Sequence, residues 1–260
     1  MKRSAALLLL LVPQVCCAQT QGAELVLTRP PDPTAASPEI IGGKPTSATE
    51  WPATFKYTGT GGKICTATAI GPRVLLTAAH CIGSVTSGKI EDSVAIDCKK
   101  HDAERYGYDM ALCVSQATIP VLNGRPYETL YVAAKPKQDE MLTLLGYGCT
   151  TNSGPVGFLY KGSSPVHTLI PFSPGFETKG GVSVCAGDSG GAAYSASGES
   201  RLIVGIAAVA INQDQRSLFT SVSDPVIRAF IASWTKEQLE KKQIVVEICG
   251  VDPNLLVCQQ

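Results

Sequence analysis

A serine flanked by glycines gives the first indication of chemistry in this 260-residue sequence. Ser189 lies in the run Gly187-Asp188-Ser189-Gly190-Gly191. A serine hydroxyl attacks a carbonyl only when a neighbouring base removes its proton, and the tetrahedral intermediate then needs backbone N–H donors nearby. Glycines allow the sharp backbone turn that aims such donors. The same run is also typical of a plain surface turn, so a base must be found elsewhere in the chain.

A histidine follows a predicted buried strand upstream of this serine. His80 lies in Thr77-Ala78-Ala79-His80-Cys81, directly after the apolar run 74–76. The chain holds three histidines, all before Ser189: His80, His101 and His167. That order excludes an α/β-hydrolase, in which the histidine follows the serine. A subtilisin-like order needs an aspartate before His80, where the chain has only Asp32 in a proline-rich stretch. The order histidine, aspartate, serine remains.

One aspartate between His80 and Ser189 stands directly before an apolar run. Asp109 precedes Met110-Ala111-Leu112-Cys113-Val114, which predicts a buried strand that begins at the carboxylate. An aspartate that fixes the tautomer of a histidine must be buried. The other aspartates of this interval lie among polar neighbours or inside the serine run; they are Asp92, Asp97, Asp102, Asp139 and Asp188. Asp109 is therefore the candidate partner of His80.

The elements around these motifs are short apolar runs broken by Gly, Pro, Asn and Ser, which predict an all-β domain. With the motifs at 77–81, 109–112 and 187–191, the chain resembles the chymotrypsin-like serine proteases over about residues 40–234. The resemblance implies two six-stranded antiparallel β-barrels with the site in the cleft between them. The first barrel would supply His80 and Asp109, and the second Ser189. A helix is predicted to close the domain, from Asp224 to about Lys242.

By this resemblance the chain is a serine endopeptidase. Ser189 is the nucleophile, His80 moves the proton, and Asp109 orients the histidine. The backbone N–H groups of Gly187 and Ser189 form the oxyanion hole. We expect no metal and no organic cofactor, and the cysteines lack the close Cys-x-x-Cys pairs of zinc sites. The alternative is a catalytically silent protease-like binding protein, although such relatives usually lose a triad residue.

The first 18 residues are typical of a secretory signal peptide. Lys2 and Arg3 precede the apolar block 5–12, and Ala18 is a small residue at the expected cut. A lipid anchor through Cys16 or Cys17 is a weaker alternative, because the residues before them are a poor lead-in. We expect a secreted, extracellular protein.

Residues 19–39 are so rich in Pro, Thr, Ala and Ser that they cannot bury enough apolar surface to fold alone, which by itself indicates a linker. The family resemblance implies that this segment is an activation propeptide. The next residues, Ile40-Ile41-Gly42-Gly43, resemble the new N-terminus of an activated family member. Cleavage after Glu39 would free the amino group of Ile40, which would form a buried ion pair with Asp188. Many relatives have Arg or Lys in place of Glu39. A trypsin is therefore not the expected activator, and self-activation with Arg216 as countercharge is a rival idea.

Ten cysteines behind a secretory signal indicate an oxidising compartment. Without Cys16 and Cys17, eight remain. The pair Cys65–Cys81 resembles the family bridge beside the catalytic histidine. Three further pairs are inferred: Cys98–Cys113, Cys249–Cys258 and Cys149–Cys185. The last follows because the loop after Ala210, where the family places the partner of Cys185, contains no cysteine.

The resemblance also places the substrate-binding residues. Ser183 would lie at the base of the primary specificity pocket, where a trypsin-like enzyme has aspartate, so cleavage after Arg or Lys is not expected. Ala208 and Ala210 lie in the strand that would pair with substrate. Ala210 and Ser217 put side chains where small glycines often leave the pocket open. These residues favour a small or medium apolar residue before the cut.

The protease domain is predicted over residues 40–242, followed by a C-terminal extension over 243–260. The chain has 22 Lys and Arg against 22 Asp and Glu and no basic cluster, so a nucleic-acid partner is not expected. No later apolar run is long enough to span a bilayer, and no membrane partner is expected. We expect a monomer that binds protein or peptide substrates, with a protein inhibitor as a further candidate partner.

Overall fold

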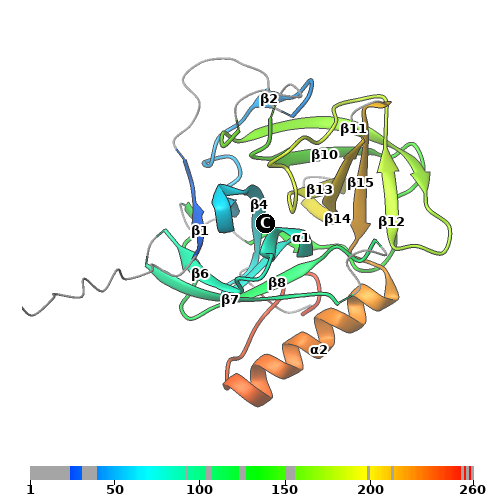
Figure 1. Cartoon of the computed structure of the whole chain (residues 1–260). Coiled ribbons are helices and arrows are strands. Elements are labelled where there is room, and N and C mark those ends of the chain that lie inside the picture. The colour runs from blue at the N-terminus through cyan, green and yellow to red at the C-terminus, as the bar shows by residue number, and fades with distance from the viewer. Residues whose placement is uncertain are drawn as a thin grey trace, which may run out of the picture.

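The computed structural model describes residues 24–30, 40–91, 93–102, 107–122, 127–149, 156–197, 200–211, 214–252, 255 and 258. The predicted signal peptide 1–18 and Glu39 therefore lie outside the described residues. Two β-barrels lie side by side, with one long helix against the first of them (Figure 1). Both barrels are built from short apolar runs separated by turn residues, as expected for an all-β chain.

The first barrel is a closed ring in the order β1-β3-β4-β5-β8-β7-β6. Its strands are β1 (Leu25–Thr28), β3 (Thr54–Thr58), β4 (Ile64–Gly71), β5 (Val74–Thr77), β6 (Ser87–Ile90), β7 (Val94–Lys100) and β8 (Ala111–Ser115). A 3-10 turn (Thr60–Gly62) joins β3 to β4, and the short helix α1 (Ala79–Ile82) follows β5.

The second barrel consists of six antiparallel strands in the order β10-β13-β14-β15-β12-β11, closed by the pairing of β10 with β11. These strands are β10 (Met141–Gly146), β11 (Tyr160–Leu169), β12 (Gly175–Thr178), β13 (Ala192–Ser197), β14 (Ser200–Ile211) and β15 (Arg216–Ser221). Two short strands extend the sheet: β2 (Lys44–Pro45) pairs with β11, and β9 (Thr129–Leu130) with β14.

The first barrel differs from the expected six antiparallel strands. It has a seventh strand, β1, which pairs with β3 in antiparallel and with β6 in parallel fashion. Leu25 and Leu27 are fully buried in its core, while Val26 and Thr28 between and after them are half-buried. This alternation is that of a strand, and burying each leucine contributes about 1.5–3 kcal/mol. β1 belongs to the segment that was predicted to be a propeptide.

The C-terminal helix α2 (Pro225–Lys242) confirms the predicted helix. Asp224 caps it by accepting a hydrogen bond from the N–H of Val226 at 2.9 Å. The buried face of the helix is Ile227, Ile231, Trp234 and Gln238, which pack on the first barrel. The sequence spacing of Val226, Phe230, Ile231 and Trp234 predicts that these four share the buried face; for Val226 this prediction is wrong, since its side chain is exposed. Among the described residues, no helix is long and apolar enough to cross a membrane.

The chain after α2 returns to the first barrel. Ile248 and Cys249 are fully buried in the first-barrel core, and the N–H of Cys249 donates to the carbonyl of Ile70 at 2.8 Å. Cys249 also accepts a hydrogen bond from the N–H of Leu130. The start of the C-terminal extension is therefore packed on the body of the domain.

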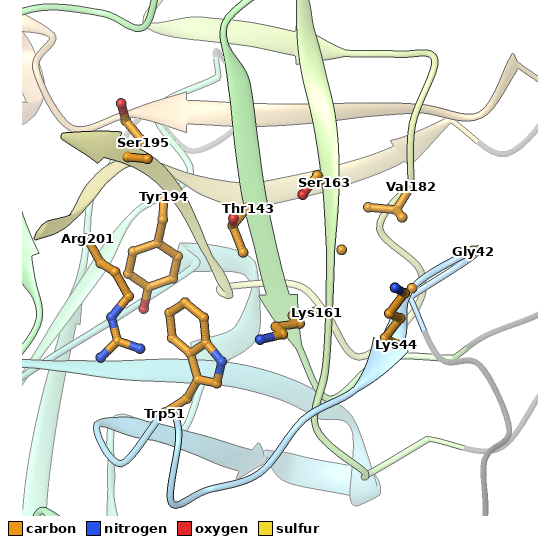
Figure 2. Close-up of a pocket in the computed structure, with 13 residues that line it drawn as sticks. Gly42, Lys44, Trp51, Thr143, Lys161, Ser163, Val182, Tyr194, Ser195 and Arg201 are labelled. Carbon is orange, nitrogen blue, oxygen red and sulfur yellow. The ribbon is translucent and has the colours of Figure 1, made fainter. Parts of the chain in front are cut away.

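A buried polar cluster joins the chain between the barrels to the second barrel. Glu128 is almost completely buried, and its carboxylate lies 3.2 Å from the guanidinium of Arg201. Arg201 in turn stacks 4.1 Å from the ring centre of Trp51, which packs against Tyr194 (Figure 2). Burial raises the pKa of Glu128 to about 7, and Arg201 only partly offsets this effect.

This pKa predicts how stability depends on pH. At pH values between 4.5, the ordinary pKa of this carboxyl, and about 7, Glu128 keeps its proton in the folded protein, whereas the unfolded chain has lost it. Stability therefore falls as pH rises through this window, by about 3 kcal/mol in full, because a tenfold change in proton affinity corresponds to about 1.4 kcal/mol. Relative to wild type, Glu128→Gln should become more stable on going from pH 5 to pH 8.

Urea unfolding of both proteins at the two pH values measures this difference. The control is Glu240→Gln, which removes an exposed carboxylate from α2 and should follow the wild-type pH dependence. Parallel curves for wild type and Glu128→Gln would show that Glu128 does not hold its proton in the folded state.

Candidate active site

The positions of His80 and Asp109 follow from two neighbouring strands. β5 and β8 pair in antiparallel fashion, and Thr77 opposite Ala111 is the last pair of their ladder. The residues that follow Thr77 and those that precede Ala111 therefore lie at the same end of the first barrel. His80 is on α1, which begins two residues after β5 ends, and Asp109 lies two residues before β8.

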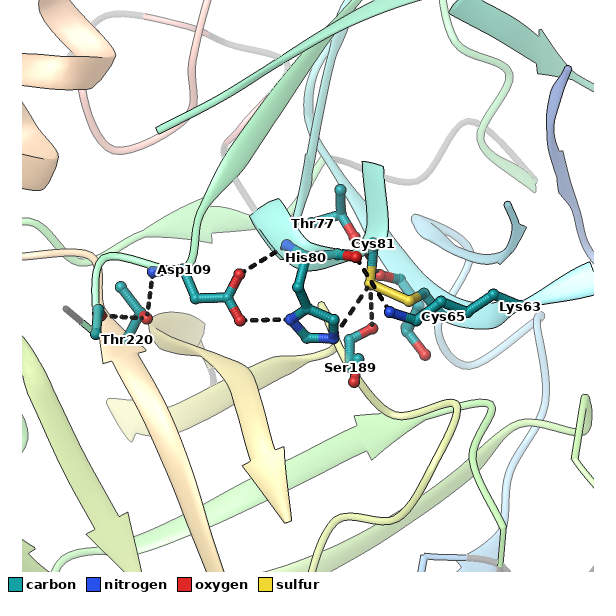
Figure 3. Close-up of polar contacts among 10 residues, drawn as sticks. Lys63, Cys65, Thr77, His80, Cys81, Asp109, Ser189 and Thr220 are labelled. Atoms are coloured by element: carbon teal, nitrogen blue, oxygen red, sulfur yellow. Dashed lines mark hydrogen bonds and ion pairs between the residues drawn. A yellow bond between two sulfur atoms is a disulfide. The ribbon is translucent and has the colours of Figure 1, made fainter. Parts of the chain in front are cut away.

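The carboxylate of Asp109 binds His80 through both of its oxygens (Figure 3). His80 Nδ1 lies 2.5 Å from Asp109 Oδ2, and the backbone N–H of His80 donates to Oδ1 at 2.9 Å. Asp109 is only 6% exposed, whereas the side chain of His80 is 29% exposed. A carboxylate in this position holds the proton on Nδ1, which leaves Nε2 as the basic nitrogen on the accessible side.

A threonine of the second barrel fixes the backbone at Asp109. Thr220 Oγ1, on β15, accepts a hydrogen bond from the N–H of Asp109 at 3.2 Å and donates to the carbonyl of Gly107 at 2.8 Å. Figure 3 shows this hydroxyl behind the carboxylate, on the side away from His80. The orientation of the aspartate therefore depends on both barrels.

Ser189 is held against the first barrel beside His80. Its carbonyl accepts a hydrogen bond from the N–H of Thr66 on β4 at 2.8 Å. The Cys81 sulfur lies 3.7 Å from this carbonyl and 3.9 Å from His80 Nε2, and Figure 3 shows Ser189 at the Nε2 edge of the ring. Within the described part of the chain, no hydrogen bond joins the Ser189 hydroxyl to His80. Such bonds are often long in unliganded sites and tighten when substrate binds.

Two backbone N–H groups around Ser189 are available to a ligand. The N–H groups of Asp188 and Gly190 donate to the carbonyls of Cys185 and Ala207. By contrast, those of Gly187 and Ser189 have no acceptor among the described residues. Gly187 has φ +102°, and a Cβ there would lie 2.8 Å from Gly148 Cα, so only glycine fits. These are the two donors that sequence reasoning assigned to the oxyanion hole.

The peptide group between Gly187 and Asp188 is oriented from the first barrel. Thr66 Oγ1 donates to the carbonyl of Gly187 at 2.9 Å and accepts from the N–H of Tyr147 at 3.0 Å. The carbonyl of Thr66 is itself held by Thr77 Oγ1 at 2.8 Å. Thr66 and Thr220 were missed by sequence reasoning, because a threonine within a strand carries no local signal of such a role.

Asp188 is fully buried behind the nucleophile. Its carboxylate accepts hydrogen bonds from the N–H groups of Gly148 and Cys185, each at 2.8 Å. The Cys149–Cys185 disulfide links the same two segments. Ile40 is fully buried in the core of the second barrel, and the N–H of Ile41 donates to the carbonyl of Ser183. The ion pair between Ile40 and Asp188 stays a prediction, since Glu39 lies outside the described residues.

The predicted specificity residues come from two neighbouring segments of the second barrel. Ser183 is buried, and the N–H of the next residue, Val184, donates to Ser217 Oγ at 2.9 Å. Ser217 stands opposite Ala210 in the pairing of β15 with β14. The Ser217 hydroxyl thus links the segment at 183–184 to these two strands. Ala208 is largely buried on the same strand as Ala210.

Arg216 does not offer a free countercharge. Its guanidinium pairs with Glu177 at 3.1 Å and with Asp214 at 2.9 Å. Both carboxylates raise its pKa, so the charge is permanent but already balanced. This arrangement speaks against the idea that Arg216 recognises Glu39 during self-activation.

Four disulfides join described residues: Cys65–Cys81, Cys98–Cys113, Cys149–Cys185 and Cys249–Cys258. They join the same pairs that were inferred from the sequence. Cys65, His80 and Cys81 place ligand-type atoms within 4.8 Å of one another. They do not fit a metal site, because both sulfurs are engaged in a disulfide and no thiolate is available.

A cavity of about 590 Å³ lies away from these residues. It is lined by Lys44, Lys161 and Arg201, and the last two lie beside the indole of Trp51 (Figure 2). The ammonium of Lys161 pairs with the carboxylate of Glu50, whereas Arg201 contacts Glu128, whose raised pKa leaves it only partly ionised near neutral pH. The cavity contains none of the candidate catalytic residues.

Comparison with known proteins agrees with this architecture. The family model described as Trypsin matches residues 40–229. Among solved structures, the fold is similar to that of human heparin binding protein, at 18% identity and a TM-score of 0.60 over 75% of this chain and 96% of that chain. It is also similar to the scabies mite inactivated protease paralogue S-D1, at 18% identity and a TM-score of 0.60 over 76% and 98% of the two chains.

At these identities the similar structures show the fold alone, and a comparison with curated protein sequences gives no match. The family model, however, covers well over half of the chain and includes His80, Asp109 and Ser189. The chain therefore belongs to the trypsin family of chymotrypsin-like serine protease domains.

Proposed function

We propose that this protein is a secreted serine endopeptidase, made as a zymogen, that cleaves peptide bonds through Ser189, His80 and Asp109. The observation that carries the proposal is the contact between Asp109 and His80, at 2.5 Å and at 2.9 Å, next to a serine whose flanking N–H groups are available. An oriented base, a nucleophile and two donors are the parts that acyl transfer requires.

The reaction follows from these positions. His80 Nε2 takes the proton of the Ser189 hydroxyl as its oxygen bonds to the substrate carbonyl carbon, and Asp109 stabilises the imidazolium. The carbonyl oxygen becomes an oxyanion that accepts from the N–H groups of Gly187 and Ser189. His80 then gives the proton to the amide nitrogen, the C–N bond breaks, and the amine leaves. Water attacks the acyl-enzyme in the same way and restores the serine.

Zymogen activation is proposed to occur by cleavage after Glu39. The new ammonium of Ile40 would approach Asp188, a fully buried carboxylate that already accepts two backbone hydrogen bonds. A buried charge is tolerable when it is both paired and hydrogen-bonded. Because Asp188 adjoins Gly187 and Ser189, this ion pair would hold the oxyanion-hole peptides in place.

Specificity for a small or medium apolar residue is proposed from the pocket. Ser183 offers no negative charge at its base, and the side chains of Ala210 and Ser217 narrow it. Secretion is proposed from the predicted signal peptide together with four disulfides, which persist in oxidising compartments.

A catalytically silent binding protein is the second candidate. The observation that favours it is the lack of a hydrogen bond between the Ser189 hydroxyl and His80 among the described residues. In that case the fold would serve recognition, and the processed protein would not react with an agent that acylates or phosphorylates an activated serine.

Labelling with a fluorophosphonate decides between the two. The substitutions Ala35→Asp, Ala36→Asp, Ser37→Asp, Pro38→Asp and Glu39→Lys create an enteropeptidase site that cuts directly before Ile40. The cleaved protein should react with the probe, because only a serine with a base and an oxyanion hole attacks it quickly. The uncut protein should react at least about tenfold more slowly, since its oxyanion hole lacks the ion pair.

Two serine variants control this measurement. Ser189→Ala should abolish labelling, whereas Ser195→Ala, on β13 of the same barrel, should leave it unchanged. Absence of labelling in the correctly cleaved, folded wild type would support the silent binding protein instead.

Thr66→Val tests how the oxyanion hole is positioned. Valine keeps the shape but leaves the Gly187 carbonyl and the Tyr147 N–H without their partner, which costs about 1–3 kcal/mol of stability. The labelling rate should fall by about tenfold or more, because the donors would no longer be held in place. The matched control is Thr178→Val, whose buried hydroxyl has no partner in the described residues. Equal labelling rates for both variants would contradict the role of Thr66.

Ser217→Gly tests the pocket. Removing this side chain should open the space between Val184 and Ala210, and shift preference toward Phe and Tyr by about tenfold or more in kcat/KM. Profiling with a peptide library measures the shift. Ser217→Ala keeps Cβ and should change preference much less, and an unchanged profile for Ser217→Gly would place the pocket elsewhere.

A further inference from the structure

The strand β1 is an integral part of the first barrel, although it precedes the proposed cleavage site. It lies between β3 and β6 and closes the ring between them (Figure 1). Val26 stands opposite Thr58 of β3 and opposite Lys89 of β6, so the strand is paired along both edges. The carbonyl of Leu27 also accepts a hydrogen bond from the N–H of Glu91 at 2.7 Å.

The gap between β3 and β6 is shaped for this strand. Leu25 and Leu27 fill it from inside and belong to the same buried cluster as Tyr57 and Ile90. On β6, Gly88 makes the close approach feasible, because a Cβ there would lie 2.3 Å from Leu25 Cβ. Any larger residue at position 88 would push β1 away.

Arg29 anchors the end of the strand. Its guanidinium lies 4.0 Å from the ring centre of Phe55 and pairs with Glu91 at 2.7 Å. It also donates to the carbonyls of Pro52 and Pro120, and its side chain is only 6% exposed. A buried guanidinium with this many partners specifies arginine, since lysine lacks the planar set of donors.

No covalent link other than the main chain ties this strand to the barrel. Residues 19–39 contain no cysteine, so cleavage before Ile40 leaves them attached by non-covalent contacts alone. We infer that the gap between β3 and β6 is a strand-accepting site for an extended peptide with leucines at alternate positions and an arginine two residues further on. The peptide that contains β1 remains bound through this strand after cleavage, and the active protein is a two-chain complex; this inference rests on the processing step of the proposed function.

Loss of β1 would affect the barrel that carries the candidate active site. Without β1, the edges of β3 and β6 would expose unpaired N–H and carbonyl groups, which are costly to leave open and prone to aggregation. The apolar interior around Tyr57 and Ile90 would face water. The same barrel carries His80 and Asp109, so the retained peptide is required for their support.

The test uses the full chain with the engineered enteropeptidase site and Ser189→Ala, so that no activity is needed or read. After cleavage, native gel filtration followed by mass spectrometry should find the N-terminal peptide and the 40–260 chain together in equal amounts. In 6 M guanidinium the two should separate. A folded 40–260 chain that elutes without the peptide and keeps its melting temperature would overturn the inference.

Two matched variants address the mode of binding. Leu27→Ala removes an inward side chain and should release the peptide about 30-fold faster or more after cleavage, whereas Val26→Ala, on the half-buried face, should stay within about threefold. Equal release from both would show that the peptide is not held as a strand with Leu27 inside. Because labelling by fluorophosphonate plays no part here, failure of this inference and failure of the proposed activity are seen separately.

Discussion

Thr66, on the first barrel, forms the hydrogen bonds that hold the Ser189 segment of the second barrel beside His80. His80 and Asp109 lie on the first barrel and Ser189 on the second, so the site exists only if the two keep a fixed relation. The N–H of Thr66 binds the carbonyl of Ser189, and its hydroxyl binds that of Gly187. The first bond acts on the peptide group that follows Ser189, and the second on the peptide group between Gly187 and Asp188. Together they hold the backbone on both sides of Ser189 against the first barrel, which carries His80.

The candidate catalytic residues could be predicted because the chemistry they would perform restricts residue types over short stretches of sequence. A serine in a glycine run, and an aspartate or histidine next to a buried strand, are short-range patterns. The chain order then excluded the other folds that use the same three residues. Thr66 and Thr220 could not be predicted, since each acts through a hydroxyl on a strand and its partners lie far away in sequence. The oxyanion-hole donors were predicted by resemblance, while their availability follows only from the bonds of their neighbours.

The same distinction explains the error in the first barrel. Leu25 and Leu27 alternate with Val26 and Thr28, which is a strand pattern, but only four residues long and bounded by proline. The composition of residues 19–39 as a whole argued against a fold of their own. That argument holds for the segment in isolation. It does not apply to a strand that completes a barrel formed by other strands. There, the edges of β3 and β6 provide its hydrogen-bond partners, and the barrel interior buries its leucines.

Under the proposed activation, the N-terminal segment has two opposed requirements: it is cut before Ile40, and β1 stays in the barrel. In the sequence, prolines lie between β1 and the proposed cleavage site. Proline has no N–H to donate to a sheet ladder, and Pro30 follows shortly after Thr28, the last residue of β1 that pairs with β3. The residues that follow up to Glu39 are rich in proline and small side chains, a composition that a protease can reach without unpairing the strand. In the proposed two-chain form, the contacts of the buried Arg29 would hold the peptide on the first barrel after the cut, so that the barrel stays closed.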